Sequence, residues 1–280
     1  NKAVGISGIK AEMLCLSPPL INEWLLGAFN YWLKNCEMPK CILKSQIWLI
    51  PKGVYDGNPA NTRPINLIEI PRKLLSTILI RRLSYRLEND QLFQSINFGF
   101  RPEMSTNDGI KSLKVIIEHS KIKKKNLCLT LLDIQKAYDS LECSSILSSL
   151  KQLNIDKKFV KLIATTFQNR SSRLLTMAGV TKFFHPQKGV EQGDPASPVI
   201  WNIFYESVLK ELNSLRGYNF EGINVSYMAY ADDIILLSED EVSMQQLLNK
   251  VNELLKVNNM AIQPKKSLNI ANFECGTFKI

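Results

Sequence analysis

Residues 226–238, SYMAYADDIILLS, constrain the fold most strongly, because they place two adjacent aspartates inside an apolar run. Charged side chains are seldom buried unless they are paired or bound to a metal. The apolar residues on both sides predict a strand, a tight turn and a second strand, with Asp232 and Asp233 at the bend. Two neighbouring aspartates usually mark a surface turn, but these apolar flanks argue against that reading.

A second apolar run also ends on an aspartate. Residues 127–133, LCLTLLD, are typical of a buried strand that finishes at Asp133. If this strand lies beside the strands of the hairpin, the carboxylates of Asp133, Asp232 and Asp233 converge. Like charges at that range repel, and hard divalent cations with oxygen ligands relieve the repulsion. Two Mg²⁺ ions about 4 Å apart, bridged by aspartates, form the phosphoryl-transfer site of polymerases and nucleases.

Composition narrows the class of protein. The 280 residues are 45% hydrophobic and 22% charged, as in folded globular proteins, so the core needs no disulfide or metal to be stable. The net charge of +9 favours a polyanionic partner such as nucleic acid or an anionic membrane, although many basic proteins bind neither. Six cysteines without a CxxC pair indicate reduced thiols in an intracellular protein rather than a zinc site.

Hydrophobic periodicity predicts an α+β chain of two subdomains, with no apolar run of the roughly 18 residues that span a bilayer. The expected helices are residues 18–35, 72–90, 105–120, 141–153, 156–168, 197–212 and 242–258. The expected strands are residues 45–52, a hairpin in 172–186, the two strands of the aspartate hairpin, and a strand-like piece in 260–270. Ser105 or Thr106 is the expected cap of its helix.

Several of these segments, taken together, resemble one family. YADD, preceded by LLDIQKAYDS and GVEQGDPASPVIWNIF, resembles the palm motifs of reverse transcriptases in the order of that family. The segments IWLIPKGVYDGNPANTRPINL and NFGFRPEMSTND resemble its finger motifs, and MAIQPKKSLNI resembles its lysine-bearing motif. The opening NKAVGISGIKAEML is similar to the segment before the fingers in non-LTR, LINE-like retrotransposon enzymes. The resemblance covers nearly the whole chain.

The resemblance implies the fingers and palm of a right-hand polymerase, with an antiparallel palm sheet packed on helices. Residues 1–126 would form the fingers with an N-terminal extension, and residues 127–270 the palm. Residues 271–280 would begin the connection to a thumb, which we expect to be absent or truncated in this stretch of sequence.

By resemblance, Asp133, Asp232 and Asp233 are the catalytic metal ligands, and the backbone carbonyl of Ile134 adds an oxygen ligand. The implied cofactor is a pair of Mg²⁺ ions, with Mn²⁺ as an alternative. Tyr138 resembles the aromatic residue that stacks under the incoming sugar and excludes a 2′-hydroxyl, although its pattern also fits a core aromatic.

The remaining expected contacts with nucleotide and template also rest on the resemblance. Gln192 of the QGDP loop would touch the nucleotide, whereas its neighbour Asp194 is also typical of a turn or cap residue. Lys52 and Arg63 would grip the triphosphate, unless they are ordinary surface charges. Lys265 or its neighbour at position 266 would approach the pyrophosphate, and Lys265 is the residue we assign to nucleotide binding.

Arg101 would contact the template strand, and a basic helix would bind the nucleic-acid backbone. The basic residues of this expected face are Arg72, Lys73, Arg81, Arg82 and Arg86. The implied partners are an RNA template, a DNA primer and deoxynucleoside triphosphates, with no membrane. The sequence does not give the oligomeric state, and the resemblance alone implies an intracellular, nuclear location.

The expected function is therefore RNA-directed DNA synthesis by two-metal nucleotidyl transfer, in the service of retrotransposition. An RNA-directed RNA polymerase on a similar palm is a rival, against which Tyr138 argues. A decayed or domesticated element that holds RNA without chemistry is a second rival. Within the family, a group II intron or retron enzyme remains open.

Overall fold

The computed structural model describes residues 3–54, 57–93 and 96–273. The chain divides into two compact units, which are treated separately below. Unit 1 comprises Asn1–Leu83 and Leu150–Ser197, and unit 2 comprises Ser84–Ser149 and Pro198–Ile280. These boundaries do not coincide with the expected change from fingers to palm after residue 126, so that assignment stays a prediction.

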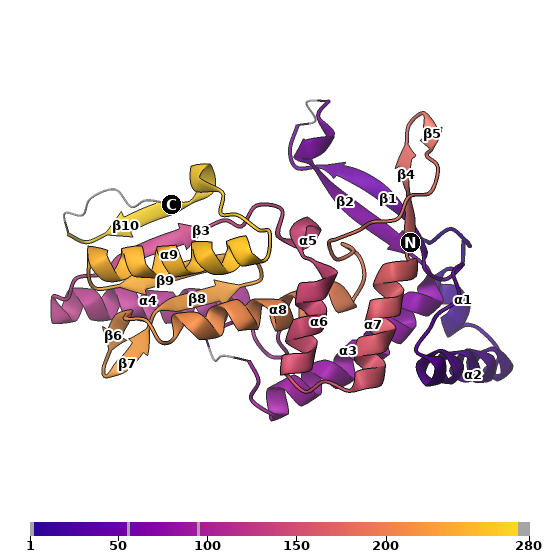
Figure 1. The fold of residues 1–280 in the computed structure, drawn as a ribbon, viewed down its shortest axis with the longest axis horizontal. Coiled ribbons are helices and arrows are strands. Elements are labelled where there is room, and N and C mark those ends of the chain that lie inside the picture. Colours follow the sequence, from indigo (N-terminus) through magenta and orange to yellow (C-terminus); the bar gives the residue numbers. More distant parts are fainter. Residues whose placement is uncertain (1–2, 55–56, 94–95, 274–280) are drawn as a thin grey trace. The chain divides into compact units, whose positions relative to one another are not determined.

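The elements alternate between helices and short strands (Figure 1). The α-helices are α1 (Ala11–Cys15), α2 (Pro19–Asn35), α3 (Ile70–Asn89), α4 (Thr106–Lys123), α5 (Ala137–Ser140), α6 (Cys143–Gln152), α7 (Lys157–Asn169), α8 (Ala196–Leu212) and α9 (Glu241–Val257). The strands are β1 (Lys44–Pro51), β2 (Thr62–Ile68), β3 (Cys128–Leu132), β4 (Ser171–Thr176), β5 (Gly179–Val180), β6 (Tyr218–Phe220), β7 (Ile223–Val225), β8 (Tyr227–Tyr230), β9 (Asp233–Ser238) and β10 (Leu268–Ala271). Single 3₁₀ turns occupy Pro59–Asn61 and Pro264–Lys266.

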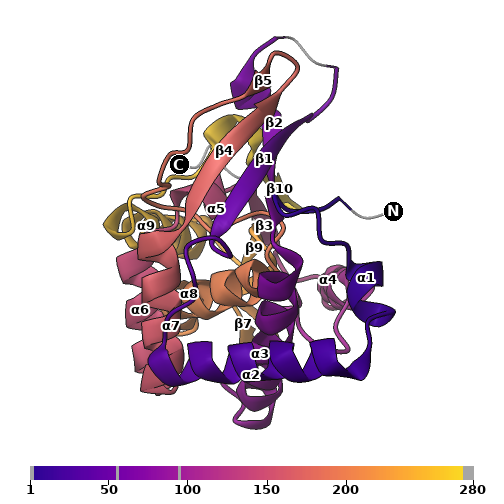
Figure 2. The same cartoon turned by 90° about the vertical axis from the view of Figure 1, so that its right-hand side faces the viewer.

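Unit 1 joins a sheet to a small helical core. The strand order is β2-β1-β4-β5, with β1 antiparallel to β2 and parallel to β4. Below the sheet, α2, α7 and the first half of α3 pack together, as Figure 2 shows. Their buried contacts come from Phe29 and Trp32, one turn apart on α2, and from Leu75 of α3 and Leu162 of α7, which together form one apolar core.

Unit 2 is built on an antiparallel sheet of strand order β10-β3-β9-β8. In Figure 1, α9 lies in front of this sheet and α4 behind it, and both helices contact its strands. Ile116 of α4 packs with Leu129, Met228 and Leu237 on one face. Because β3 is central and covered on both faces, its sequence is mostly apolar rather than alternating, and even its one polar residue, Thr130, is fully buried.

Local sequence signals set the helix ends. A capping box begins α4. The side chain of Ser105 accepts the backbone N–H of Asp108, and the side chain of Asp108 accepts the backbone N–H of Ser105. Asp156 caps α7, and Asp240 caps α9, through side-chain oxygens that accept backbone N–H groups. Pro19 stands in the first turn of α2, where its missing N–H has no intrahelical partner to lose.

The expected α+β class is confirmed, and so are the expected helices, to within a few residues at their ends. The sequence reading missed β2 and the β6–β7 hairpin. It also treated residues 260–270 as one strand-like piece, whereas a 3₁₀ turn interrupts them before β10. Among the described residues, no helix combines the length and apolarity needed to cross a membrane.

Candidate active site

The register of unit 2 brings the predicted carboxylates to one end of its sheet. The antiparallel pairing of β3 with β9 includes Leu132 opposite Ile234. Asp133 is the next residue after β3, and Asp233 is the first residue of β9, so both lie at this same end. Asp232 occupies the two-residue turn between β8 and β9. The structure therefore groups the three aspartates as the sequence predicted.

The turn that carries the aspartates has an unfavourable backbone conformation. Ala231 has a φ of 57°, in the left-handed region that side-chain-bearing residues rarely adopt. Its carbonyl accepts a 3.0 Å hydrogen bond from the indole Nε1 of Trp201. Gly99 lies against the other side, where an added Cβ would collide with the backbone nitrogen of Ala231. Strained residues persist when their surroundings fix them, and here two neighbours do so.

The support behind the turn comes from α8 and from the segment before α4. Asn202, next to Trp201 on α8, donates a side-chain hydrogen bond to the carbonyl of Gly99. Phe98 donates its backbone N–H to the carbonyl of Ala229 in β8, at 2.9 Å. Sequence reasoning missed Gly99, Trp201 and Asn202, because only the tertiary contacts reveal what they hold.

Negative charge accumulates at this end of the sheet. Burial raises the pKa of the Asp233 carboxyl, and the nearby Asp232 and Asp133 raise it further. Burial also raises the pKa of Tyr205, and the charges of Asp232 and Asp233 raise it further. The Tyr205 side chain is fully buried, and its hydroxyl has no hydrogen-bond partner among the residues that the structure describes.

The donor chemistry here fits a divalent cation. Partly exposed carboxylates are the hard oxygen ligands that Mg²⁺ prefers, and their mutual repulsion favours an added cation. Within residues 3–54, 57–93 and 96–273, however, no three His, Cys, Asp or Glu side chains are already close enough together to hold an ion. The ammonium of Lys266 lies 3.5 Å from Oδ2 of Asp133.

Tyr138 lies beside this centre. Its ring stacks on Trp201, with centroids 5.6 Å apart and planes 15° from parallel. Burial raises the pKa of its hydroxyl, and the charge of Asp232 raises it further. The residue is therefore both a packed aromatic and a neighbour of the aspartate turn, so the two interpretations of the sequence are compatible.

Three other expected nucleotide-binding residues, Lys52, Arg63 and Gln192, lie in unit 1. Lys52 and Arg63 are exposed on the β1–β2 hairpin, with Arg63 opposite Ile50 in the register. Gln192 is half-buried, and its carbonyl accepts a 2.6 Å hydrogen bond from the backbone N–H of Asn66 in β2. Gly193 adopts a φ of 131°, and an added Cβ would collide with the Asn66 carbonyl, so this position requires glycine.

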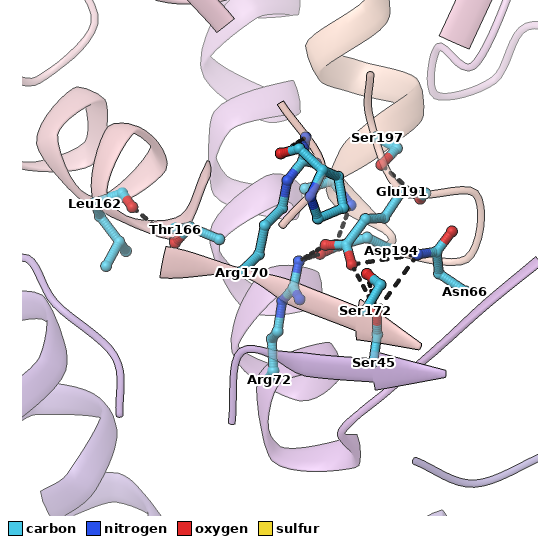
Figure 3. Close-up of polar contacts among 12 residues, drawn as sticks. Ser45, Asn66, Arg72, Leu162, Thr166, Arg170, Ser172, Glu191, Asp194 and Ser197 are labelled. Atoms are coloured by element: carbon cyan, nitrogen blue, oxygen red, sulfur yellow. Dashed lines mark hydrogen bonds and ion pairs between the residues drawn. The ribbon is translucent and has the colours of Figure 1, made fainter. Parts of the chain in front are cut away.

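Arg72 is not part of an exposed basic face, which corrects the sequence expectation. Its side chain is 3% exposed and forms ion pairs with Glu191 and Asp194, shown in Figure 3. Asp194 also accepts the backbone N–H of Ala196 at 2.9 Å, at the start of α8. Asp194 is thus a capping and ion-pairing residue, which was the alternative that the sequence left open.

Arg101 makes structural contacts in unit 2. Its guanidinium binds both carboxylate oxygens of Glu88, at 2.8 and 2.6 Å, and donates to the carbonyl of Asn97 at 2.9 Å. Its predicted contact with the template is not tested by these bonds and stays a prediction. The same holds for Lys265, whose neighbour Lys266 is the lysine observed at Asp133.

Comparison with known proteins identifies the family. The sequence pattern that defines the family described as "Reverse transcriptase (RNA-dependent DNA polymerase)" matches residues 50–274. The chain belongs to the reverse transcriptase family. Members of this family generally use divalent metal ions, in agreement with the carboxylate chemistry of unit 2.

Similar proteins come from non-LTR retrotransposons. The Pol polyprotein of the type-1 retrotransposable element R2 of Nasonia vitripennis is 26% identical over 92% of this chain and 25% of its own length. That of the type-2 element R2DM of Drosophila melanogaster is 28% identical over 88% of the chain and 23% of its own length. The chain therefore spans about a quarter of these curated relatives.

Solved structures confirm the fold. Apo telomerase from Candida tropicalis superimposes with a TM-score of 0.63, over 91% of this chain and 50% of its own, at 15% identity. The same telomerase truncated from its C-terminal domain gives a TM-score of 0.62, over 91% of this chain and 56% of its own, at 14% identity. This agreement supports the expected arrangement of a reverse transcriptase fold.

Replacing Asp233 with Asn should stabilise the metal-free protein at neutral pH. Because the fold raises the pKa of Asp233, its ionised form is unfavourable above that pKa, and this penalty disappears as the pH falls below the ordinary value of 3.8. We expect the melting temperature to rise by roughly 2 °C in chelator at pH 7 and to be unchanged near pH 3. With added Mg²⁺ the parent should have the higher melting temperature, because binding of the ion to its folded state stabilises the parent and not the variant.

Asp108→Asn provides a control of opposite sign in the same thermal melts. Hydrogen bonds from Ser105 lower the pKa of Asp108, so its replacement should destabilise the protein at neutral pH, an effect that is lost on acidification. Equal behaviour of the Asp233 and Asp108 variants would contradict the repulsion inferred at the aspartate turn.

Trp201→Phe should weaken the support of the turn while keeping a ring for Tyr138 to stack on. The Ala231 carbonyl would lose its indole donor, which should cost about 1–3 kcal/mol in the free energy of urea unfolding. Trp24→Phe is the matched control, since Trp24 is 71% exposed on α2. Equal losses in the two variants would show that the indole hydrogen bond contributes nothing specific.

Proposed function

We propose that this chain is the polymerase part of a retrotransposon protein and synthesises DNA on an RNA template. The observation that carries the proposal is the grouping of Asp133, Asp232 and Asp233 at one end of the unit 2 sheet, in a chain of the reverse transcriptase family. Curated relatives named as retrotransposon Pol polyproteins support the same conclusion.

In this proposal the three aspartates hold two divalent ions, Mg²⁺ or alternatively Mn²⁺, with the backbone carbonyl of Ile134 as a further ligand. Ions bound there would lower the pKa of the primer 3′-hydroxyl and offset the charge of the leaving pyrophosphate. The protein supplies rigid placement: the turn is fixed by Trp201 and Gly99, so the carboxylates need little reorganisation when the reaction proceeds.

Other residues would bind the incoming deoxynucleoside triphosphate. Lys52 and Arg63 are exposed on the β1–β2 hairpin, so phosphate oxygens could reach their charged groups. Tyr138 would contact the sugar, and Gln192 would contact the nucleotide from the QGDP loop. Lys265, or Lys266 beside Asp133, would approach the pyrophosphate.

The proposed partners are an RNA template, a DNA primer and deoxynucleoside triphosphates, with Arg101 near the template. The net charge of +9 supports a polyanionic partner. One structural neighbour, a Candida tropicalis telomerase, was solved with a fragment of telomeric RNA, so this fold accommodates RNA in that protein. A nuclear location follows from the proposed role in retrotransposition and is part of the same proposal.

Primer extension tests the proposal directly. We expect the parent chain, with the flanking segments of its natural protein, to extend a DNA primer on an RNA template when Mg²⁺ is present and to stop in chelator. Asp232→Asn should lower the rate by roughly a hundred- to thousandfold, because it removes one anionic ligand from the reacting centre. Asp90→Asn, at an exposed surface pair, should keep the parental rate.

The outcomes separate the alternatives. A folded parent that binds RNA but never extends the primer would support the non-catalytic scaffold instead. Equal extension by the parent and the Asp232 variant would contradict the metal assignment.

Tyr138→Ala should relax the choice of sugar. Removal of the ring would open space for a 2′-hydroxyl, so we expect the ratio of deoxynucleotide to ribonucleotide efficiency to fall by about a hundredfold. Tyr138→Phe keeps the ring and should retain selectivity, and Tyr85→Ala, at a 71% exposed tyrosine, is the surface control. An unchanged ratio in Tyr138→Ala would remove this residue from sugar selection.

A further inference from the structure

Unit 1 contains a compact group of buried charges directly around the QGDP loop (Figure 3). The guanidinium of Arg72 pairs with the carboxylates of Glu191 and Asp194, and all three side chains are at most 8% exposed. Burial alone would raise the pKa of Glu191, but the charge of Arg72 and then that of Arg170 hold it below its ordinary value. Two cations and two anions therefore balance within the interior of unit 1.

Neutral donors complete the site of Glu191. Its Oε1 accepts hydrogen bonds from the Ser45 hydroxyl at 3.1 Å and from the Asn66 amide at 3.4 Å. Its Oε2 faces Arg72. Ser45 belongs to β1 and Asn66 to β2, so the carboxylate joins two strands to the guanidinium at the start of α3. Both oxygens act as acceptors, and the ionised form satisfies every one of these contacts.

The two carboxylates bracket the residue expected to touch the nucleotide. Glu191 stands immediately before Gln192, and Asp194 stands two residues after it, beyond Gly193. The Glu191 carbonyl accepts the Asp194 N–H at 3.0 Å, and the Asn66 N–H is bound by the Gln192 carbonyl at 2.6 Å. The Arg72 guanidinium thus holds both ends of the segment 191–194. The Gln192 carbonyl, inside this segment, is hydrogen-bonded to β2.

This arrangement is poorly suited to simple stabilisation. Buried ion pairs lose much of their attraction to desolvation, and apolar side chains of similar volume often replace them without loss of stability. Their better-attested use is to fix one arrangement among several. Here the arrangement that is fixed is the backbone of Gln192.

We propose that Arg72, Glu191 and Asp194 are positioning residues that hold Gln192 in register for the incoming nucleotide. The inference rests on the proposed function, since Gln192 has a role only if the chain binds nucleoside triphosphates. None of the three buried residues contacts the substrate itself. Loss of the cluster should therefore act through Gln192 on nucleotide binding and leave the aspartate chemistry of unit 2 intact.

Glu191→Gln is the sharpest variant, because it keeps the shape of the side chain and removes its charge. An amide has an acceptor at one end only, so its NH₂ group must face either Arg72 or the donors of Ser45 and Asn66. We expect the KM for the deoxynucleotide to rise roughly tenfold, with kcat within about twofold of the parent. Gln192→Ala should give the same split between KM and kcat.

Two controls separate positioning from general damage. Glu37→Gln removes the same charge from an exposed site in unit 1 and should leave both constants unchanged. Leu162→Ala weakens the buried helical core of unit 1 without touching the loop. At temperatures below its unfolding transition, it should not reproduce the KM effect. If Glu191→Gln does not fold, Ser45→Ala removes a single hydrogen bond to the same carboxylate and should raise the KM about two- to fivefold.

Hydrogen exchange gives a readout that does not depend on activity. The N–H groups of Asn66 and Asp194 should exchange faster in Glu191→Gln than in Leu162→Ala at matched stability, while β3 and β9 stay protected in both. Unchanged hydrogen exchange at the loop in Glu191→Gln would overturn the positioning role. So would a rise in KM in Gln192→Ala that Glu191→Gln does not show.

A parent chain that makes no DNA would overturn the proposed function instead, and with it the nucleotide part of this inference. Exchange would then still decide whether the cluster fixes the loop. A parent that is active, with a KM unaffected by Gln192→Ala, would sink the inference while leaving the proposed function standing.

Discussion

The repulsion that the carboxylates of Asp232 and Asp133 exert on Asp233 is the constraint that the aspartate end of the unit 2 sheet has to withstand. Burial and neighbouring carboxylates raise the pKa of Asp233, so the fold holds a charge that it does not itself neutralise. Such an arrangement persists only if the backbone cannot relax away from it. The central position of β3, the short β8–β9 turn and the supports from α8 all restrict that relaxation.

The clustered carboxylates of the two units differ in burial and in their partners. In unit 1, Arg72 and Arg170 balance Glu191 and Asp194 within the protein, and the surrounding hydroxyl and amide groups satisfy the oxygens. In unit 2, the structure places the ammonium of Lys266 3.5 Å from Oδ2 of Asp133, at the end of the sheet where the three aspartates lie. A closed cluster fixes geometry, whereas an open one binds cations. The carboxylates of unit 1 are thus paired inside the protein, whereas those of unit 2 are the ones proposed to bind cations.

Many of the strands and helix ends were predictable from the sequence, because they depend on patterns of neighbouring residues. Apolar runs ending on Asp133 and flanking Asp232 predicted neighbouring strands, and the Ser105 capping signal predicted the start of α4. The interpretation of Arg72 failed because its partner Glu191 lies 119 residues away, and a basic helical pattern does not show which cation turns inward. β2 was missed because its residues follow a turn-rich loop and include Pro64.

The contacts of Trp201 lead to a coupling that no pattern of sequence would have shown. One face of the indole stacks on Tyr138, and its Nε1 holds the Ala231 carbonyl of the aspartate turn. The ring proposed to select the sugar and the backbone that carries the proposed metal ligands therefore share one support. Residues that share a partner do not respond independently to substitution. A change at Tyr138 that shifts the indole should therefore also shift the turn, which links the proposed sugar selection to the placement of the proposed metal ligands.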